Sequence, residues 1–396
     1  MTEHEPGSRL VAFKNVTVSE DYFQGHFPGT PLMPAVLMIE ALTQVAAALI
    51  LDHAGASHQA ARVTLRGVNA AKFRRNVFPG DRLHLEVTLG RVRSRLAKAQ
   101  ARAHVDGQTV AEAELLLAIE RGAAFIDSSA HVHPSARIGE GTTIGPQAII
   151  GADVTIGRNC LIGSSVVVDG WTEIGDETQI YPMASIGLAP QDLKYRGERT
   201  RLTIGRRNIF REFVTINRGT AGGGGETTIG DNNLFMAYVH VAHDCHIGDN
   251  TIFGPHATLG GHVGVEDFAN ISAGSAVHQF CRVGRHAFIG GYSVVTKDAL
   301  PFARTIGSRP ARIFGVNTIG LQRRGFTPNT ITQLRHVYRY LLQSKLNTTR
   351  ALTQIEQDST LSAPEVRYMV EFIRSSQRGV ILRRAGRRAE ELVADE

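Results

Sequence analysis

The chain has 396 residues, of which 42% are hydrophobic and 20% are charged, so it should fold into at least two soluble globular units. Its net charge of +6 is modest and no aromatic-interleaved basic strand accompanies it, which argues against a nucleic-acid-binding protein and favours an acidic partner. The odd number of three cysteines argues against a disulfide framework, and their spacing lacks the pairs typical of a metal site, so we expect a reducing compartment.

Residues 1–122 contain one long apolar segment followed by segments of alternating character. The apolar segment is typical of a buried helix at 34–51, and three strand candidates follow it, at 83–90, 97–105 and 111–119. This order predicts an α+β unit whose sheet wraps around the helix. The apolar run carries Glu40 and Gln44 and is too short to span a bilayer, and the first ten residues lack the order of a secretory signal. We therefore expect a cytoplasmic protein with no membrane span.

Residues 123–317 follow a six-residue period. Every sixth residue from Ile126 to Ile186 is Ile or Val, and the period resumes in two later runs, Ile204 to Ile216 and Ile229 to Val295. Strands repeat every two residues and helices every 3.6, whereas a six-residue period is typical of a parallel β-helix. Three hexads make one triangular coil, so residues about 18 apart should lie in one column with a spacing of about 4.8 Å. The glycine that often follows the inward residue should ease the corner between two strands.

Two loops interrupt this period. Residues 187–203 lack the inward-pointing apolar residue but leave the phase of the six-residue period unchanged. Residues 217–228, NRGTAGGGGETT, shift that phase. Insertions in a solenoid project as loops on one face, which is often the binding face. These loops are therefore the first candidates for ligand contacts.

Residues 318–396 change to helical character. Pro328 and Thr330 precede a helix predicted at 331–342, and a second helix is predicted at 364–375. Such helices would cover the open end of the solenoid. The predicted fold class is therefore mainly β, a parallel β-helix of hexapeptide repeats with a C-terminal α-helical cap, preceded by an α+β domain, with domains at 1–122, 123–317 and 318–396.

Histidines concentrate in the last run of the period: His240, His243, His246, His256, His262 and His278. Any one of them could be an ordinary polar surface residue. The coil length, however, places His243 below Gly261 and Gly261 below Gln279, with Asp244 below His262 in the next column. We expect these side chains to cluster on one face.

The cluster has the groups that acyl transfer to a hydroxyl needs. A neutral imidazole is a natural general base, and a glycine lets a substrate carbonyl approach a backbone N–H. A metal site is the rival interpretation, but only one acid, Asp244, adjoins His240 and His243, and no H-x-x-x-H motif occurs. Cys245 lies on the same side of a strand as His243, yet no third group orients such a nucleophilic pair. We expect no metal and no cofactor.

Several segments in this order resemble the UDP-N-acetylglucosamine 3-O-acyltransferase family: QDLKY, VTINRGT, MAYVHVAHDC, TLGGHV, AVHQFC, FGVNTIGLQRRGF and FIRSSQRG. The resemblance covers residues 125–380 and implies a left-handed β-helix and a homotrimer with active sites between neighbouring subunits. The activity it implies is transfer of an (R)-3-hydroxyacyl chain from acyl carrier protein to the 3-hydroxyl of UDP-N-acetylglucosamine, the first step of lipid A biosynthesis.

The resemblance also implies roles for individual residues. His243 matches the general base, Asp244 its acidic neighbour and Gly261 the oxyanion position. Ten further residues are implied in substrate binding: Asp192 and Lys194 in the first loop, His240, His262, His278 and Gln279 around the sugar and the acyl chain, Gly291 in the acyl groove, and Asn317, Arg323 and Arg324 at the nucleotide. Lacking a side chain, Gly291 should leave the groove open to a longer acyl chain.

Two positions depart from the family pattern. Asn217 stands where some members have histidine, and Ile319 where some have glutamate, so contacts to the nucleotide are expected to differ. Without the resemblance, Lys194 could be a solvated loop residue, and Arg323 and Arg324 an ordinary charged helix start.

The N-terminal segment FQGHFPGTPLMPAVLMIEALTQ resembles β-hydroxyacyl-carrier-protein dehydratases, which have a hotdog fold, and the match continues to residue 119. His26 and Glu40 match that family's catalytic histidine and glutamate, which face each other across a dimer interface. Because the chain starts close before the strand leading to GHFPG, the family's leading helix and first strand are expected to be absent. Ala35 replaces a glycine at the start of the central helix, and its methyl group should narrow the approach to the thioester.

The expected function is therefore O-acylation of UDP-N-acetylglucosamine, with dehydration of 3-hydroxyacyl-carrier protein as a second activity. Two alternatives stay open: a hotdog domain that serves only assembly or carrier-protein docking, and a related hexapeptide N-acyltransferase. Trimers joined by hotdog dimers would form a hexamer.

Overall fold

The computed structural model of the chain describes residues 3–53, 61–93, 96–344 and 346–382. The chain divides into two compact units, Met1–Phe125 and Ile126–Glu396. The end of the predicted helical region 318–396 lies outside the described residues.

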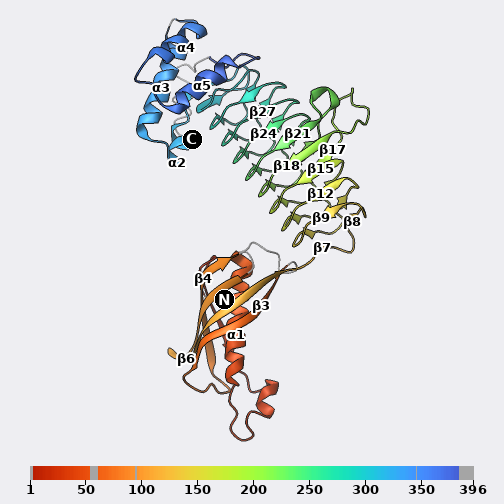
Figure 1. Cartoon of the computed structure of the whole chain (residues 1–396), viewed down its shortest axis with the longest axis vertical. Coiled ribbons are helices and arrows are strands. Elements are labelled where there is room, and N and C mark those ends of the chain that lie inside the picture. The colour runs from red at the N-terminus through yellow and green to blue at the C-terminus, as the bar shows by residue number, and fades with distance from the viewer. Residues whose placement is uncertain (1–2, 54–60, 94–95, 345, 383–396) are drawn as a thin grey trace. The chain divides into compact units, whose positions relative to one another are not determined.

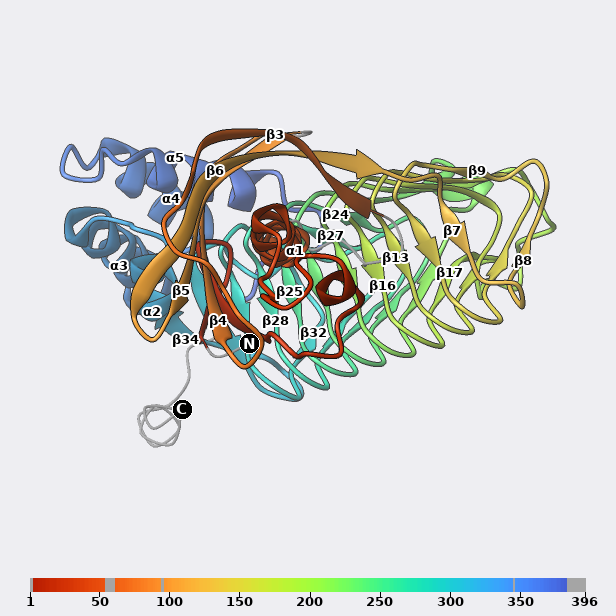
Figure 2. The same cartoon turned by 90° about the horizontal axis from the view of Figure 1, so that it is seen from below.

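The first unit is an antiparallel sheet that curves around one helix, α1 (Ala35–His53) (Figure 2). A 3-10 turn, η1 (Asp21–Gln24), precedes the helix. The strand order is β1-β2-β4-β5-β6-β3, with the respective bounds Glu3–Glu5, Arg9–Asn15, Arg82–Arg93, Leu96–Val105, Gln108–Arg121 and Ala61–Phe73. The strands predicted at 83–90, 97–105 and 111–119 are β4, β5 and β6, whereas β1 and β3 were not predicted. Upstream of the GHFPG motif the described residues form two strands, β1 and β2.

The sheet holds α1 as a core helix. Alternate residues of β5, from Ala97 to Val105, are buried, and the helix packs against β2 to β6. By length and composition alone, Ala35–Asp52 could cross a membrane, so the expectation that no segment is long enough is wrong. Half of this helix segment is buried inside the unit, however, and the core helix of a soluble protein passes the same test.

The second unit is a left-handed parallel β-helix whose three sheets form a triangular prism (Figure 1). One sheet contains β7, β10, β13, β16, β19, β22, β25, β28, β31, β33 and β34, with bounds Phe125–Ile126, Thr143–Ile144, Leu161–Ile162, Gln179–Ile180, Ile209–Phe210, Leu234–Phe235, Ile252–Phe253, Asn270–Ile271, Phe288–Ile289, Ala303–Ile306 and Arg312–Val316. A second contains β8, β11, β14, β17, β20, β23, β26, β29 and β32, with bounds His131–Val132, Ile149–Ile150, Val167–Val168, Ser185–Leu188, Thr215–Asn217, His240–Val241, Thr258–Leu259, Ala276–Val277 and Val294–Val295. The third contains β9, β12, β15, β18, β21, β24, β27 and β30, with bounds Arg137–Ile138, Val154–Ile156, Trp171–Ile174, Arg201–Ile204, Glu226–Ile229, His246–Ile247, Gly264–Val265 and Arg282–Val283.

The columns follow the predicted coil length. Thr143 pairs with Leu161 and Ile144 with Ile162, so one coil takes 18 residues. The inward column is buried almost throughout, and its phenylalanines Phe210, Phe235 and Phe253 stack with ring centroids 4.7 and 4.6 Å apart. Ile126 is 43% exposed because it belongs to the first coil, which has a neighbouring coil on one side only.

The glycines that follow the inward residues were predicted to ease the corners between strands, but the structure gives another reason for their presence. A Cβ atom on Gly139 would lie 2.5 Å from the backbone of Gly157. None of the six glycines of this kind in the first run has a positive φ: Gly139, Gly145, Gly151, Gly157, Gly163 and Gly175. They are therefore needed for the close stacking of coils. The left-handed corner positions are instead occupied by residues such as Asn159 (φ 54°) and Asp244 (φ 58°).

The two interruptions are loops outside the prism. Arg201 pairs with Trp171, 30 residues earlier instead of 18, so the intervening loop at 189–200 leaves the coil. His240 pairs with Thr215, 25 residues earlier, and the extra residues form a turn around η2 (Ala221–Gly223).

Among the described residues of the second unit, four helices accompany the prism (Figure 1). Their bounds are α2, Thr318–Arg323; α3, Pro328–Gln343; α4, Thr348–Gln357; and α5, Pro364–Arg374. The helices predicted at 331–342 and 364–375 are α3 and α5, and α2 and α4 were not predicted. Arg323 ends α2 and Arg324 caps its C-terminus, so reading them as a helix start is wrong.

Candidate active site

His243 and Asp244 form a hydrogen-bonded pair at a corner of the prism. The Nδ1 atom of His243 lies 2.7 Å from Oδ2 of Asp244. Neighbouring residues can make this contact because Asp244 has φ 58°, which turns the chain between β23 and β24. Since Nδ1 faces a carboxylate oxygen, Nδ1 is assigned as the donor, and in the neutral imidazole the lone pair is then on Nε2.

The carboxylate of Asp244 is fully buried and is held by the inserted turn. Thr220 donates its N–H to Oδ1 at 2.8 Å and its hydroxyl to Oδ2 at 2.6 Å. The N–H of Asp244 donates to the hydroxyl of Thr227 at 2.8 Å. Gly223 packs so closely that a Cβ atom there would lie 2.2 Å from Cγ of Asp244. Sequence reasoning pointed to the loop but missed Thr220 and Gly223.

Gly261 lies directly against the imidazole of His243. A Cβ atom on Gly261 would be 2.6 Å from Cε1 and 2.9 Å from Nε2 of that ring. The N–H of Gly261 donates no hydrogen bond within the part of the chain that the structure describes. The expected column of His243 and Gly261 is therefore present, with a free backbone donor beside the imidazole.

Two further histidines adjoin this pair. His262 lies with Nε2 3.8 Å from Oδ2 of Asp244 and its ring centroid 5.2 Å from that of His243. Burial lowers the pKa of His262, and the charge of Asp244 opposes this effect. His240 contacts the hydroxyl of Thr215 at 2.7 Å, and burial, with a contribution from His243, lowers its pKa as well. Both imidazoles are therefore biased toward the neutral form.

The loop at 189–200 carries the predicted contacts Asp192 and Lys194. Asp192 accepts the N–H of Lys194 at 2.9 Å, and its negative charge opposes the lowering of the His262 pKa. Lys194 is exposed. Arg218 fastens the loop, because its Nε and Nη2 both donate to the hydroxyl of Tyr195, at 3.2 and 3.0 Å.

The next coils place the remaining predicted contacts in order along the prism. Gln279 follows in the column of Gly261, and Nδ1 of His278 lies 3.2 Å from the carbonyl oxygen of Gln279. Gly291 is exposed, and a Cβ atom there would meet only the carbonyl oxygen of Ala273, at 3.5 Å. A side chain would therefore fit at position 291 without displacing the backbone.

The predicted nucleotide contacts lie at another corner of the same chain. The side chain of Asn317 caps α2 by accepting the N–H of Gly320 at 3.2 Å, and it donates to the carbonyl oxygen of His286 at 3.1 Å. Arg324 lies over the ring of Phe268, 4.8 Å from its centroid, and Arg323 is exposed. Within the described residues, no contact brings these three residues to His243.

The cysteines are poor nucleophiles. The thiol of Cys245 is buried and donates to the carbonyl oxygen of Gly260 at 3.2 Å, and burial raises its pKa to about 12. Burial raises the pKa values of Cys160 and Cys281 to about 11. These thiols stay protonated at neutral pH.

His243, Asp244 and His262 also satisfy the spacing of a metal site, with ligand atoms within 4.8 Å of one another. The carboxylate oxygens of Asp244, however, already accept three hydrogen bonds, from Thr220 and from His243. Three of the roughly four acceptor positions of this carboxylate are therefore occupied, which favours a proton-transfer cluster over a metal centre.

The predicted dehydratase residues lie on neighbouring elements of the first unit. Nδ1 of His26 lies 3.0 Å from the carbonyl oxygen of Leu32, in the segment between η1 and α1. Glu40 is exposed on α1 and accepts a hydrogen bond from Gln44 at 3.1 Å. No described contact joins His26 to Glu40 within one chain. Ala35 is the first residue of α1.

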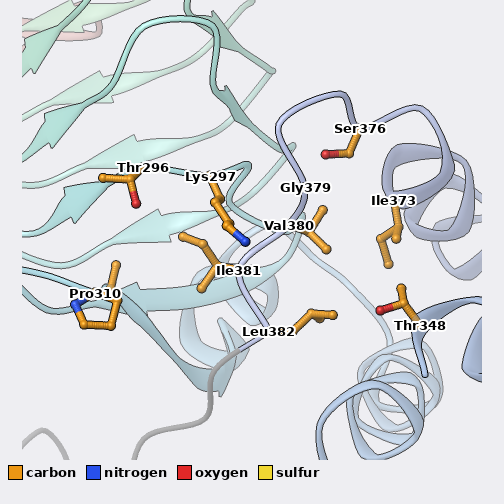
Figure 3. Close-up of a pocket in the computed structure, with 11 residues that line it drawn as sticks. Thr296, Lys297, Pro310, Thr348, Ile373, Ser376, Gly379, Val380, Ile381 and Leu382 are labelled. Carbon is orange, nitrogen blue, oxygen red and sulfur yellow. The ribbon is translucent and has the colours of Figure 1, made fainter. Parts of the chain in front are cut away.

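A cavity of about 700 Å³ lies elsewhere, between the last coil of the prism and the helices (Figure 3). Its walls include Thr296, Lys297, Ile373 and Ile381, and none of the predicted site residues lines it. The histidine cluster is instead on the outside of the prism, where His243 and His262 keep 17% and 24% of their side-chain surface exposed.

Family models match three parts of the chain. Residues 1–114 match a FabA-like domain, residues 226–261 match the bacterial transferase hexapeptide repeats, and residues 298–381 match domain 2 of UDP-N-acetylglucosamine O-acyltransferase. Among curated proteins, the acyl-[acyl-carrier-protein]–UDP-N-acetylglucosamine O-acyltransferase of Alkalilimnicola ehrlichii is 46% identical over 256 residues, which cover 65% of this chain and 98% of that protein. The protein of the same name from Anaeromyxobacter dehalogenans is 46% identical over 194 residues, 49% of this chain and 75% of its own length.

Solved structures agree with these relatives. The UDP-N-acetylglucosamine acyltransferase from Bacteroides fragilis superposes with a TM-score of 0.63 at 44% identity, covering 65% of this chain and all of that chain. The enzyme from Francisella novicida gives a TM-score of 0.63 at 38% identity, covering 67% of this chain and 96% of its own. Because a relative 46% identical is matched over nearly its whole length, the chain belongs to the acyl-[acyl-carrier-protein]–UDP-N-acetylglucosamine O-acyltransferase family.

Proposed function

We propose that this acyltransferase moves an (R)-3-hydroxyacyl chain from acyl carrier protein to the 3-hydroxyl of UDP-N-acetylglucosamine, the first step of lipid A biosynthesis, in the cytoplasm. The names of the relatives supply the donor and the acceptor. The histidine cluster lies on the outside of the prism with its histidines partly exposed, which supports a homotrimer in which a neighbouring subunit forms the second wall of each site. The residues at the other corner, Asn317, Arg323 and Arg324, would then bind the nucleotide in the site of a neighbouring subunit.

The reaction follows from the three central groups. Nε2 of His243 takes the proton of the sugar 3-hydroxyl while that oxygen attacks the thioester carbonyl carbon. The carbonyl oxygen becomes an oxyanion, which the free N–H of Gly261 stabilises. The intermediate then collapses, the carbon–sulfur bond breaks, and the imidazolium returns its proton to the leaving thiolate. No acyl-enzyme is needed, in keeping with the protonated thiol of Cys245.

One observation carries this proposal: the hydrogen bond from Nδ1 of His243 to Asp244, with Gly261 packed against the same ring. It leaves Nε2 available as a base beside an unused backbone donor. Around this centre we assign Lys194 to the substrate, Asp192 to the 3-hydroxyl of the acyl chain, and His240, His262, His278 and Gln279 to the sugar and the acyl chain. Gly291 would leave the groove open to a longer chain.

The test is mass spectrometry of products formed from UDP-N-acetylglucosamine and 3-hydroxyacyl-carrier proteins of varied chain length. His243→Ala should reduce acylation by about 10²-fold or more, because it removes the general base. His246→Ala is the matched control, since this exposed histidine bonds Thr228 on the next face of the prism. Unchanged product with His243→Ala would overturn the mechanism.

A second function is proposed for the first unit, dehydration of 3-hydroxyacyl-carrier protein by His26 and Glu40. It is supported by the FabA-like match and by the contact of His26 with the carbonyl oxygen of Leu32, which fixes the ring so that Nε2 can face a substrate. Glu40 of a second subunit would supply the acid. The alternative is a hotdog domain that serves only assembly or carrier-protein docking.

Formation of a 2-enoyl thioester separates these two possibilities. The wild type should form it, and both His26→Ala and Glu40→Gln should abolish it, whereas His84→Ala, an exposed histidine on β4, should not. Equal amounts of product from wild type and His26→Ala would show that His26 is not catalytic, which leaves assembly or carrier-protein docking as the function of this unit.

Comparing UDP-N-acetylglucosamine with its 3-O-acylated, deacetylated successor as acceptor tests the remaining alternative, a related N-acyltransferase. We retain the division into domains at 1–122, 123–317 and 318–396 as part of this proposal.

A further inference from the structure

The inserted turn at 218–225 reaches the acid that holds the base. Thr220 contributes two of the hydrogen bonds to Asp244, one to each carboxylate oxygen. Thr220 is 8% exposed and the Asp244 side chain is fully buried, so water does not replace these bonds. Two bonds from one residue prevent the carboxylate from rotating about its Cβ–Cγ bond, and hydrogen bonds to an ionised group are strong.

The turn also fixes Thr220 itself. Its carbonyl oxygen accepts the N–H groups of Gly223, at 3.1 Å, and of Gly225, at 2.8 Å. Gly223 then covers the carboxylate at a distance that no side chain would permit. The hydroxyl of Thr220 is therefore presented to Asp244 from a closed turn.

The hydroxyl and the imidazole share one oxygen. Oδ2 accepts from Thr220 at 2.6 Å and from Nδ1 of His243 at 2.7 Å. A hydrogen bond to a carboxylate disperses its negative charge, so the carboxylate attracts an imidazolium less strongly. The other titratable groups here are His262, 3.8 Å from the same oxygen, His240, whose pKa is lowered by His243, and Asp192 and His246, whose charges both act on His262.

We infer that Thr220 is a positioning residue for the acyl transfer: it turns Oδ2 of Asp244 toward His243 and so holds the imidazole with Nε2 free to take the proton of the sugar hydroxyl. This inference rests on the proposed role of His243 as the base. If that role is correct, Thr220 affects the reaction without touching either substrate.

The test is the pH profile of kcat/KM for acyl transfer. Thr220→Val keeps the size of the side chain and the backbone bond but removes the hydroxyl. It should lower kcat about 10-fold, with little change in KM, and move the acidic limb to higher pH by roughly half a unit, because the imidazole then holds its proton more tightly. Thr220→Ser should restore both values. Thr178→Val, the same exchange at a buried residue inside the prism, should leave the acidic limb in place.

Thermal unfolding of each variant shows whether it is folded, and Thr220→Cys, which has a weaker donor of similar size, replaces Thr220→Val if the latter does not fold. An acidic limb that stays at the wild-type pH in Thr220→Val, or in its replacement Thr220→Cys, would overturn the inference, and so would a Thr220→Ser enzyme as slow as Thr220→Val. Failure of the proposed function has a different signature, namely full activity of His243→Ala.

Discussion

Two neighbouring glycines of the inserted turn have different surroundings. A Cβ atom on Gly223 would lie 2.2 Å from the carboxylate of Asp244, whereas one on Gly222 would meet nothing within 4 Å. Neither residue has a positive φ, so the two positions differ in space and not in backbone strain. Of these two glycines, Gly223 is therefore the one that the close approach of the turn to Asp244 requires.

We predict opposite outcomes for the two alanine variants. Gly223→Ala should push the turn away from Asp244 and misplace the base, with a fall in kcat on the order of 100-fold. Gly222→Ala should keep wild-type kcat, because its methyl group enters open space. Steady-state kinetics of both variants, with thermal unfolding to verify folding, provide the measurement. Equal kcat values in the two variants would show that the turn does not position the acid.

The residues of the site differ in how far the sequence could predict them. His243 and Gly261 are one coil apart, so counting residues along the period was sufficient to place them together. Thr220 lies 24 residues before Asp244, across an insertion that breaks the period. The 18-residue spacing of the coils cannot place Thr220, because the path of an inserted turn depends on packing that the six-residue period does not encode. The glycine-rich sequence of the turn, NRGTAGGGGETT, was the only signal, and it indicated a loop without indicating that the loop contacts Asp244.

At the scale of elements, regular patterns predicted regular structure. The hexads predicted the three sheets of the prism, and the alternation in Ala97–Val105 predicted β5. The strand β3 was missed because its residues do not alternate, and its pairing with β6 shifts register at two places. The helix α4 was missed because only Ala351, Leu352 and Ile355 of its ten residues are buried, which leaves a short and weak apolar face.

One histidine connects the prism to its helices. The ring of His286 lies between Phe268 and Phe302, with centroid distances of 4.7 and 5.8 Å, and Phe326, just after α2, packs against its edge at 4.9 Å. Burial, reinforced by the charges of Arg285 and Arg324 and opposed by Asp267, lowers the pKa of His286 to about 4. The folded protein therefore keeps this imidazole neutral.

This shift predicts a loss of stability in acid. The unfolded chain binds a proton at His286 near its ordinary pKa of 6.5, and the folded chain does so only near 4. As the pH falls from 6.5 to 4, the free energy of unfolding should decrease by about 3 kcal/mol at most from this group. His286→Phe should reduce that decrease, because phenylalanine binds no proton. The replacement should fit, since Phe268 and Phe302 have the same left-handed backbone conformation as His286.

Thermal midpoints measured from pH 7.5 to pH 4.5 test this prediction. The wild-type midpoint should fall more steeply than that of His286→Phe, and the two should converge or cross as the pH decreases. His256→Phe is the control, because this exposed ring stacks on Tyr238 in a similar way but meets water in both states. Parallel curves for wild type and His286→Phe would contradict a role for His286 in the acid sensitivity.

At the scale of the whole molecule, the chain combines two folds with different proposed symmetries. The prism is proposed to form trimers and the hotdog unit to form dimers. In the described part of the first unit, β3 is a 13-residue strand at the edge of the sheet. It carries partly exposed apolar side chains, among them Leu65, Val68 and Phe73. A long apolar edge strand is a template for pairing with another chain.

A chain that makes both a threefold and a twofold contact would assemble into a closed hexamer. Native mass spectrometry of the full chain should therefore give six times the chain mass of 43.0 kDa. The double variant Leu65→Lys with Val68→Lys should give three times that mass and keep its acyltransferase activity, because charges on an edge strand block pairing while the prism is unchanged. Val18→Lys, at a residue that is 74% exposed before η1, adds charge away from the edge and should leave the hexamer intact. A trimeric wild type, or a hexameric double variant, would show that the edge of the hotdog sheet does not join the trimers.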